Sequence, residues 1–191
     1  MKNLLNTKPC RVICSLSLVM AVFLSACGEK PGTTAPKASA VDQLAPRYES
    51  TLAEGIDFKK PGYPSFLLEV AGVSSLEEWG RWTDAIAAPE VKFRFNKPLP
   101  KKFVLELQAN AFGPNEGKPT RIRVGNVEHV VIIKNVPNYA VYAAEFDDVV
   151  SADTIEIFPP SPVLPKEVDP SSKDERKLGL GLVSLKIKTV N

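Results

Sequence analysis

From residue 47 onward, apolar and polar residues alternate in short runs that are separated by turn residues. A period of two is typical of strands that bury one face, and 91–95 is a clear case, with Val, Phe and Phe separated by Lys and Arg. Runs of this kind predict strands at residues 66–70, 91–95, 103–112, 121–124, 127–133, 139–146, 154–158 and 180–190. Only the short segments 48–54 and 74–78 favour a helix.

This spacing of strands, with no helices alternating between them, predicts an all-β fold. We expect an antiparallel β-sandwich of about eight strands, jelly-roll-like in topology. The proline-rich segments 97–100 and 158–162 suit the corners between strands, because proline cannot continue the hydrogen bonding of a strand.

The first 26 residues differ from the rest and read as an export signal. Lys2, Lys8 and Arg11 precede an almost continuous apolar run at 12–24, which is too short to span a bilayer as a mature helix. The run ends in Leu-Ser-Ala-Cys at 24–27, which resembles the lipobox of bacterial lipoproteins. An ordinary signal peptide with a cysteine near its end is the alternative.

The lipobox predicts that Cys27 is acylated and becomes the first mature residue. Acyl chains would then hold the protein on a membrane. Residues 27–46 are rich in Pro, Ala and Thr and predict a flexible tether, followed by the β-sandwich at 47–191. Gly28 stands where an Asp would favour retention in the inner membrane, so we expect a cell-envelope protein on the outer membrane, facing the periplasm.

Charge and cysteine content narrow the function further. The chain has 24 basic and 22 acidic residues, and this near balance argues against a nucleic-acid partner. Loss of residues 1–26 removes three basic residues and leaves 21 against 22, a net charge of −1. The three cysteines are Cys10, Cys14 and Cys27, so we expect no disulfide and no cysteine ligand in the mature domain.

Catalytic groups are scarce, and we expect no enzyme activity, no cofactor and no metal site. His129 is the single histidine and sits within an alternating run, where a strand histidine of structural role is expected. The carboxylate pairs at 77–78 and 147–148 are neighbours in sequence, and neighbours on a strand point to opposite faces. Two carboxylates from distant strands remain the open alternative for a glycosidase.

Residues 79–84 form the strongest candidate for a ligand site. Trp79 and Trp82 offer flat rings to a sugar face, while Arg81 and Asp84 offer polar groups to its hydroxyls. The alternative is that the rings pack in the core or at its rim and that Arg81 pairs with a nearby carboxylate. The odd spacing puts only one ring outward if the segment is a strand.

Two further segments supply candidate ligand-binding residues. The turn at 112–119 sets Asn115 and Lys118 at a rim, or else is simply a sheet corner in which Asn115 holds a turn. Asp174 and Arg176 precede the last predicted strand. They are either a solvated charge cluster or a buried pair that anchors the loop.

Four segments together resemble a known family: DFKKPGYP at 57–64, EWGRWTD at 78–84, AFGPN at 111–115 and DERKLGLGL at 174–182. They are similar in order and spacing to a small β domain of unknown function. That domain lies at the C-terminus of bacterial membrane phosphoglycerol transferases of the sulfatase-like, lipoteichoic-acid-synthase-like group. The resemblance covers about residues 56–190, and the catalytic module of those enzymes is absent. It implies a sandwich-like accessory domain of the periplasm, here as a stand-alone lipoprotein.

Two functions follow from these observations. In the first, a non-catalytic sandwich binds an envelope glycan or a phosphoglycerol-substituted saccharide near Trp82, Arg81 and Asn115. In the second, the sandwich is a structural or assembly module that docks on a membrane-bound transferase or another envelope protein.

Overall fold

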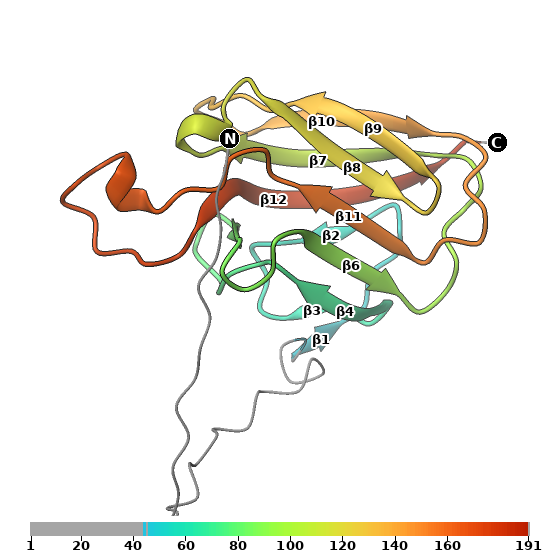
Figure 1. The fold of residues 1–191 in the computed structure, drawn as a ribbon. Helices are drawn as coiled ribbons and strands as arrows, with labels where there is room; N and C mark the ends of the chain where they lie inside the picture. Colours follow the sequence, from blue (N-terminus) through green and yellow to red (C-terminus); the bar gives the residue numbers. More distant parts are fainter. Residues whose placement is uncertain (1–43, 45, 191) are drawn as a thin grey trace, which may run out of the picture. The chain divides into compact units, whose positions relative to one another are not determined.

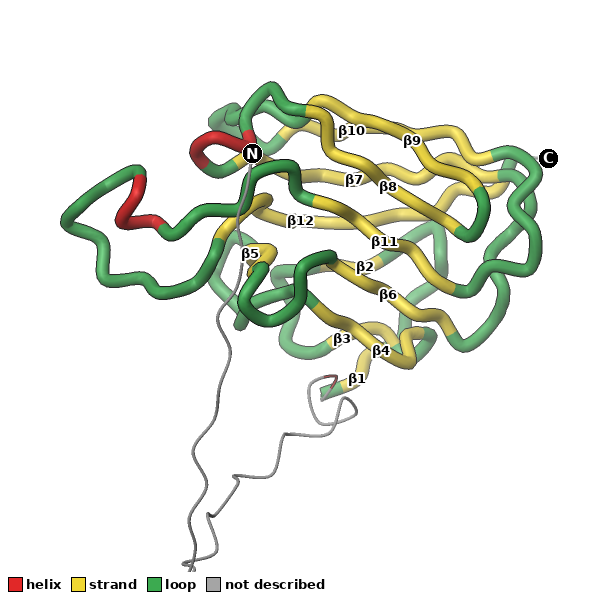
Figure 2. Tube along the Cα trace, viewed as in Figure 1, coloured by secondary structure: helices red, strands yellow, loops and turns green. Residues whose placement is uncertain are grey.

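Twelve strands account for nearly half of the chain that the structure describes. The computed structural model describes Leu44 and residues 46–190. The strands are β1 (Arg47–Tyr48), β2 (Ile56–Asp57), β3 (Tyr63–Pro64), β4 (Leu67–Ala71), β5 (Arg81–Asp84), β6 (Val91–Phe95), β7 (Phe103–Ala111), β8 (Pro119–Val124), β9 (Val127–Ile132), β10 (Ala140–Phe146), β11 (Thr154–Phe158) and β12 (Leu178–Thr189). Two 3₁₀ turns, η2 (Gly113–Asn115) and η3 (Pro165–Glu167), are the helical elements with full bounds in this part, and Figure 2 shows them among the loops.

The strands form two antiparallel sheets that pack face to face (Figure 1). In the β7 sheet the order is β10-β7-β12, with β2 and β5 both pairing along the free side of β12. In the β11 sheet the order is β4-β6-β11-β8-β9. The eight strands from β5 to β12 thus follow the order of a jelly roll, with β4 and β2 added at the edges. A short parallel pair, β1 and β3, lies outside both sheets.

Alternation along each strand builds the core between the sheets. In β7, buried and half-buried residues alternate without a break, and the buried ones are Phe103, Leu105, Leu107, Ala109 and Ala111, as the sequence predicts. Buried side chains of β6, β8, β11 and β12 meet them from the facing layer and the neighbouring strand. The all-β sandwich is therefore confirmed.

The strand count of about eight was too low, since β1, β2, β3 and β5 were not predicted. Each of these has four residues or fewer, which is too short for a period of two to stand out. The helices expected at 48–54 and 74–78 are absent. In the first segment, a single turn ends at Gly55, whose φ is 81° and whose backbone lies close to that of Leu185. In the second segment, the Ser74 N–H donates to the carbonyl oxygen of Trp82 at 2.8 Å, so the backbone bonds to β5 and does not form a helix.

The predicted signal, Cys27 and nearly all of the predicted tether lie outside the described residues. Two tether residues are described. Leu44 is fully buried and belongs to the core, and Pro46 accepts a hydrogen bond from the Tyr63 N–H at 3.1 Å. The packed part of the chain thus includes Leu44, three residues ahead of the expected boundary at 47. Among the described residues, no helix has the length and apolar character needed to cross a membrane.

Candidate ligand-binding site

Two tryptophans lie together at the start of β5. The ring centroids of Trp79 and Trp82 are 4.8 Å apart and their planes are inclined by 68°. The odd spacing separates such rings only on a continuous strand, and β5 begins at Arg81, after Trp79. Between them Gly80 has a φ of 151°, and a Cβ atom there would stand 2.1 Å from the carbonyl oxygen of Leu182. Only glycine fits this approach, and the turn it allows brings the two rings into contact.

A glycine in the neighbouring strand makes room for the two rings. Gly181 of β12 pairs with Trp82, and a Cβ atom on Gly181 would stand 3.0–3.1 Å from both indoles. Trp79 also stacks on Tyr139, with centroids 5.4 Å apart and planes at 13°, and Trp82 meets Phe112 edge-on at 5.4 Å. We call these four half-buried rings, Trp79, Trp82, Phe112 and Tyr139, the aromatic ledge.

Tyr139 reaches the ledge from the loop that precedes β10. Its backbone has a φ of 53°, and its carbonyl oxygen accepts a hydrogen bond from Gln108 Nε2 at 3.3 Å. The loop is held further by Asn110, whose amide both donates to and accepts from the backbone of Val136, at 3.1 and 2.7 Å. Partial burial raises the pKa of the Tyr139 hydroxyl, and the negative charge of Glu77 adds to the shift.

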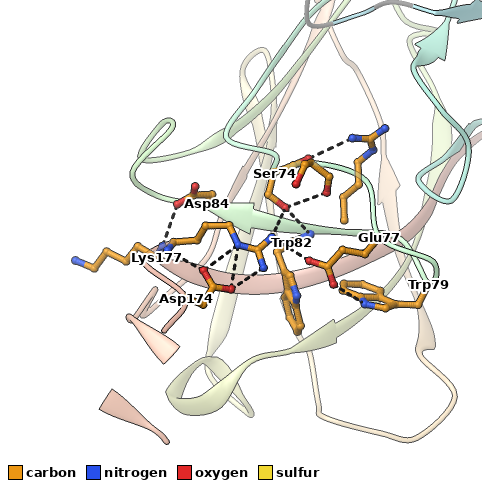
Figure 3. A network of polar contacts seen from close by, with 10 residues as sticks. Ser74, Glu77, Trp79, Trp82, Asp84, Asp174 and Lys177 are labelled. Carbon is orange, nitrogen blue, oxygen red and sulfur yellow. Dashed lines mark hydrogen bonds and ion pairs between the residues drawn. The ribbon is translucent and has the colours of Figure 1, made fainter. Parts of the chain in front are cut away.

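A charged network backs the ledge, and Figure 3 shows it close by. Arg176 binds the Asp174 carboxylate through Nε and Nη2 at 2.6–3.1 Å, and its Nη1 donates to Glu77 Oε1 at 2.9 Å and Ser74 Oγ at 3.1 Å. The other oxygen of Glu77 accepts the Trp79 indole N–H at 2.9 Å. The loop before β12 is thus tied through Glu77 to a ring of the ledge.

The network shifts the pKa values of Asp174 and Arg176 in opposite directions. The side-chain hydrogen bonds from Arg176 hold the pKa of the Asp174 carboxyl below its usual range, although partial burial opposes this. The same hydrogen bonds raise the pKa of the Arg176 guanidinium. Side-chain exposures of 27–31% at Asp174, Arg176 and Glu77 leave all three partly open to solvent. Of the two interpretations of Asp174 and Arg176, the structure supports the pair that anchors the loop, although the pair is half-buried and not fully buried.

Arg81 lies behind the ledge, only 8% exposed. Its guanidinium donates to the carbonyl oxygens of Ser74 and Lys60, both at 3.3 Å, and its Cζ stands 5.0 Å from the ring centroid of Tyr63. The Nε atom is buried and has no hydrogen-bond partner in the described chain. Burial also raises the pKa of Tyr63 to about 12. Arg81 therefore supports the surface from within.

Asp84 and Asn115 bind backbone groups of the protein itself. The Asp84 carboxylate accepts the N–H groups of Ile86 and Lys177, each at 3.0 Å. Asn115 is fully buried; its amide donates to the Phe112 carbonyl at 2.7 Å and accepts the Ser161 N–H at 2.8 Å.

Lys118 is exposed and donates to Ser161 Oγ at 2.9 Å. The structure thus brings together five of the eight candidates, Trp79, Trp82, Arg81, Asp174 and Arg176. It places Asn115 and Lys118 at the corner between β7 and β8, where Asn115 sits behind Phe112. Asp84 joins β5 to the start of β12.

A cavity of about 370 Å³ also opens on the side of β7 and β12 that carries Gln108 and Ser184. Its other walls include Tyr48, Lys60 and Lys186. The sequence did not single out these residues for a site, although Lys60 falls in the segment 57–64 that carries the family resemblance. Tyr48 of β1 and Asp57 of β2, two strands too short to predict, line the cavity, and β2 pairs with the long strand β12.

His129 and Asp147, which the sequence analysis considered for catalysis, lie among structural partners. His129 packs edge-on against Phe146, with centroids 4.7 Å apart, and Asp147 pairs with Lys102 at 3.1 Å. Within residues 46–190 and Leu44, no three His, Cys, Asp or Glu side chains gather in a way that could hold a metal ion.

Comparison with known families gives a match to the model "Domain of unknown function (DUF7024)", over residues 41–189. The chain belongs to this family. Among curated proteins, the DUF7024 chain is 38% identical to Phosphoglycerol transferase I of Escherichia fergusonii over 135 residues, which is 71% of this chain and 17% of that protein. It is 35% identical to Phosphoglycerol transferase I of Escherichia coli SE11 over 169 residues, 82% of this chain and 22% of that protein. The corresponding protein of Citrobacter koseri is 38% identical over 135 residues.

The DUF7024 chain spans about a fifth of the length of these relatives. The resemblance to a small domain of phosphoglycerol transferases is therefore confirmed. No solved structure matches the chain.

Proposed function

We propose that this protein is a lipid-anchored component of the cell envelope whose β-sandwich binds an envelope saccharide without catalysing a reaction. The observation that carries the proposal is the aromatic ledge. Indole and phenol rings supply flat apolar area on which the C–H face of a sugar ring packs, and their polar edges orient the ligand. In the ledge, the half-buried rings of Trp79, Trp82 and Tyr139 lie near the carboxylates of Glu77 and Asp174, which can accept hydrogen bonds from hydroxyl groups.

The way the ledge is held favours binding. Gly80, Gly181 and the bond from Trp79 to Glu77 fix the rings before any ligand arrives. A rigid surface loses little conformational entropy on binding, which raises affinity for a given contact area. Arg176 orients Glu77 in the same way.

The relatives suggest the ligand class. They carry the name Phosphoglycerol transferase I, so a segment shared with them is suited to hold a molecule that bears or accepts a phosphoglycerol group. We therefore propose an envelope glycan, or a phosphoglycerol-substituted saccharide, as the ligand. The proposed anchor is the acyl modification of Cys27. It would hold the protein on the outer membrane, with the β-sandwich facing the periplasm. The absence of enzyme activity stays a prediction.

A fluorescence titration tests the proposal. Envelope oligosaccharides, with and without phosphoglycerol, are added to the purified protein while its tryptophan emission is followed. We expect a saturable change that Trp82→Ala and Trp79→Ala weaken at least tenfold, because truncating an aromatic anchor in an interface costs about 2 kcal/mol. Val130→Ala is the control, since Val130 is an exposed apolar residue of β9, at the edge of the other sheet. The proposal fails if no oligosaccharide changes the emission, or if the tryptophan variants bind as the parent does.

Docking on a membrane-bound transferase is the second candidate. It is favoured by the match to a segment of only 17–22% of those enzymes, because a separate copy of such a segment can act on the enzyme in trans. Binding of the purified protein to a relative's transferase that lacks its matching segment tests it. A complex in size-exclusion chromatography supports docking, and independent elution of the two proteins contradicts it.

A further inference from the structure

The cavity beside the ledge has an unusual set of charges. Its lining includes Lys59, Lys60 and Lys186, and none of the three has a carboxylate within ion-pair distance in the described chain. Lys186 stands opposite Glu106 in the register of β12 and β7, yet the Glu106 carboxylate binds Lys188 at 2.6 Å. Lys186 is thus left for the cavity.

The carboxylates of the same lining are already engaged. Glu49 accepts the hydroxyl of Ser65 at 3.2 Å, and Glu54 accepts both the N–H and the hydroxyl of Thr51 at 2.8–2.9 Å. Asp57 accepts the backbone N–H two residues further on, at 3.0 Å. The carboxylates of the lining therefore accept hydrogen bonds from neutral groups of the protein, while the three lysines make no ion pair within the described residues; the Lys60 ammonium lies 5.0 Å from the ring centroid of Tyr48.

Arg81 adds a fourth positive charge directly behind the wall. Its Nη2 donates to the carbonyl of Lys60, and no carboxylate lies within ion-pair distance of it among the residues described. A buried charge is costly without a counter-charge, and stacking on Tyr63 offsets this only in part. The lining itself carries three lysines and three carboxylates, and Arg81 behind Lys60 gives this region an excess of one positive charge, which attracts an anion entering the cavity.

The cavity and the ledge are joined by Gln108. Its Nε2 donates to the carbonyl of Tyr139 in the ledge, and its Oε1 accepts from Ser184 of the cavity wall at 3.4 Å. Along β12, Gly181 under the ledge and Ser184 in the cavity are three residues apart, roughly 10 Å at the rise of a strand. One ligand of a few sugar units spans that distance.

We infer that this cavity binds an oxyanion carried by the saccharide on the ledge, through Lys60 and Lys186. The inference rests on the proposed function, since it names the second contact of the same ligand. A volume of about 370 Å³ is at the lower end of the range of roughly 300–1,000 Å³ of small-molecule sites, which suits a substituent better than a whole glycan.

Three matched ligands test the inference by calorimetry: one neutral oligosaccharide, the same chain with a phosphate ester, and the same chain with a carboxylate. We expect the phosphate ester to bind about tenfold more tightly than the neutral chain, and the double variant Lys60→Gln/Lys186→Gln to remove that difference. Binding of the neutral chain should not change. Lys166→Gln, at an exposed position of η3, is the control for a general loss of positive charge. A preference for the carboxylate would assign the oxyanion to an acidic sugar instead.

The possible failures are distinguishable. If Trp82→Ala abolishes binding while neutral and charged chains bind equally, the saccharide proposal stands and the cavity inference is wrong. If no saccharide binds, the proposed function is wrong, and inorganic phosphate then tests the cavity alone. Amide resonances of Gln108 and Ser184 that shift with phosphate, and do not shift in the double variant, support an oxyanion site; unmoved resonances overturn it.

Discussion

Replacing Gly181 by alanine tests whether the shape of the ledge matters for binding. A Cβ atom at Gly181 would stand 3.0 Å from Cη2 and Cζ3 of Trp79 and 3.1 Å from Cζ3 of Trp82. Carbon atoms in contact lie about 3.5–4.0 Å apart, so each ring has to retreat by roughly 0.5–1 Å. The backbone of Gly181 does not have a positive φ, and alanine therefore meets no conformational strain there.

The free energy of unfolding should change little. Overpacking a closed core costs about 1–3 kcal/mol, but these rings are half exposed and have solvent to move into. The loss of glycine also lowers the entropy of the unfolded chain, which stabilises the fold by about 0.4–1 kcal/mol. We expect a net change within about 1 kcal/mol in urea unfolding.

Saccharide binding, in contrast, should weaken about three- to tenfold, because the displaced rings lose their common surface with Tyr139. The near-ultraviolet circular dichroism of the tryptophan pair should change as well. Gly179→Ala is the matched control: its Cβ would meet Pro159 at 2.5 Å and Thr83 at 2.9 Å, so it should destabilise the fold without moving the indoles. Parent-like affinity and an unchanged spectrum in Gly181→Ala would refute the reasoning.

Three further predictions concern the residues around the ledge and the anchor. Arg176→Gln should lower the free energy of unfolding by about 1–2 kcal/mol at pH 7, since it removes two partly exposed ion pairs. The pKa of the Asp174 carboxyl is lower in the folded state, so this stabilisation is present above the usual pKa near 4 and is lost as the pH falls through the lower folded value. In urea unfolding, the difference in free energy between Arg176→Gln and the parent should therefore be smaller at pH 2.5 than at pH 7. An equal difference at the two pH values would contradict the prediction. Asn115→Ala should destabilise by about 1–3 kcal/mol in the same assay, because it leaves the partly buried N–H of Ser161 without its acceptor, and saccharide affinity should fall only as far as Phe112 is displaced. Cys27→Ala should abolish incorporation of radioactive palmitate and leave the domain folded by circular dichroism; labelled protein would disprove the lipobox assignment.

Much of the fold follows from local pattern, because the long strands bury one face over five or more residues. Strands β6, β7, β8 and β11 lie where alternation predicts them. The short strand β5 has no such signal, since its two buried residues, Arg81 and Thr83, are polar. It is held by pairing with β12, almost 100 residues away, and pairing over that distance leaves no trace in a local window.

The site, too, is predictable only where its signal is local. The tryptophans are conspicuous by residue type, and Arg176 by its neighbouring charges. That Arg176 meets Glu77 and that Tyr139 stacks on Trp79 depends on loops brought together by the sandwich. The turn that unites the two rings depends on one glycine, Gly80, whose role appears only when the carbonyl of Leu182 is in place.

The indole N–H resonances of Trp79 and Trp82 test the central claim most directly. In ¹H–¹⁵N spectra of the purified protein, addition of an envelope oligosaccharide should shift both signals along a saturable curve. Trp79 should report most strongly, because its N–H donates to Glu77 beside the bound sugar. The claim is contradicted if both indole signals stay in place for every oligosaccharide tested while the protein remains folded, or if the shifts gather on the far edge strand β9 instead.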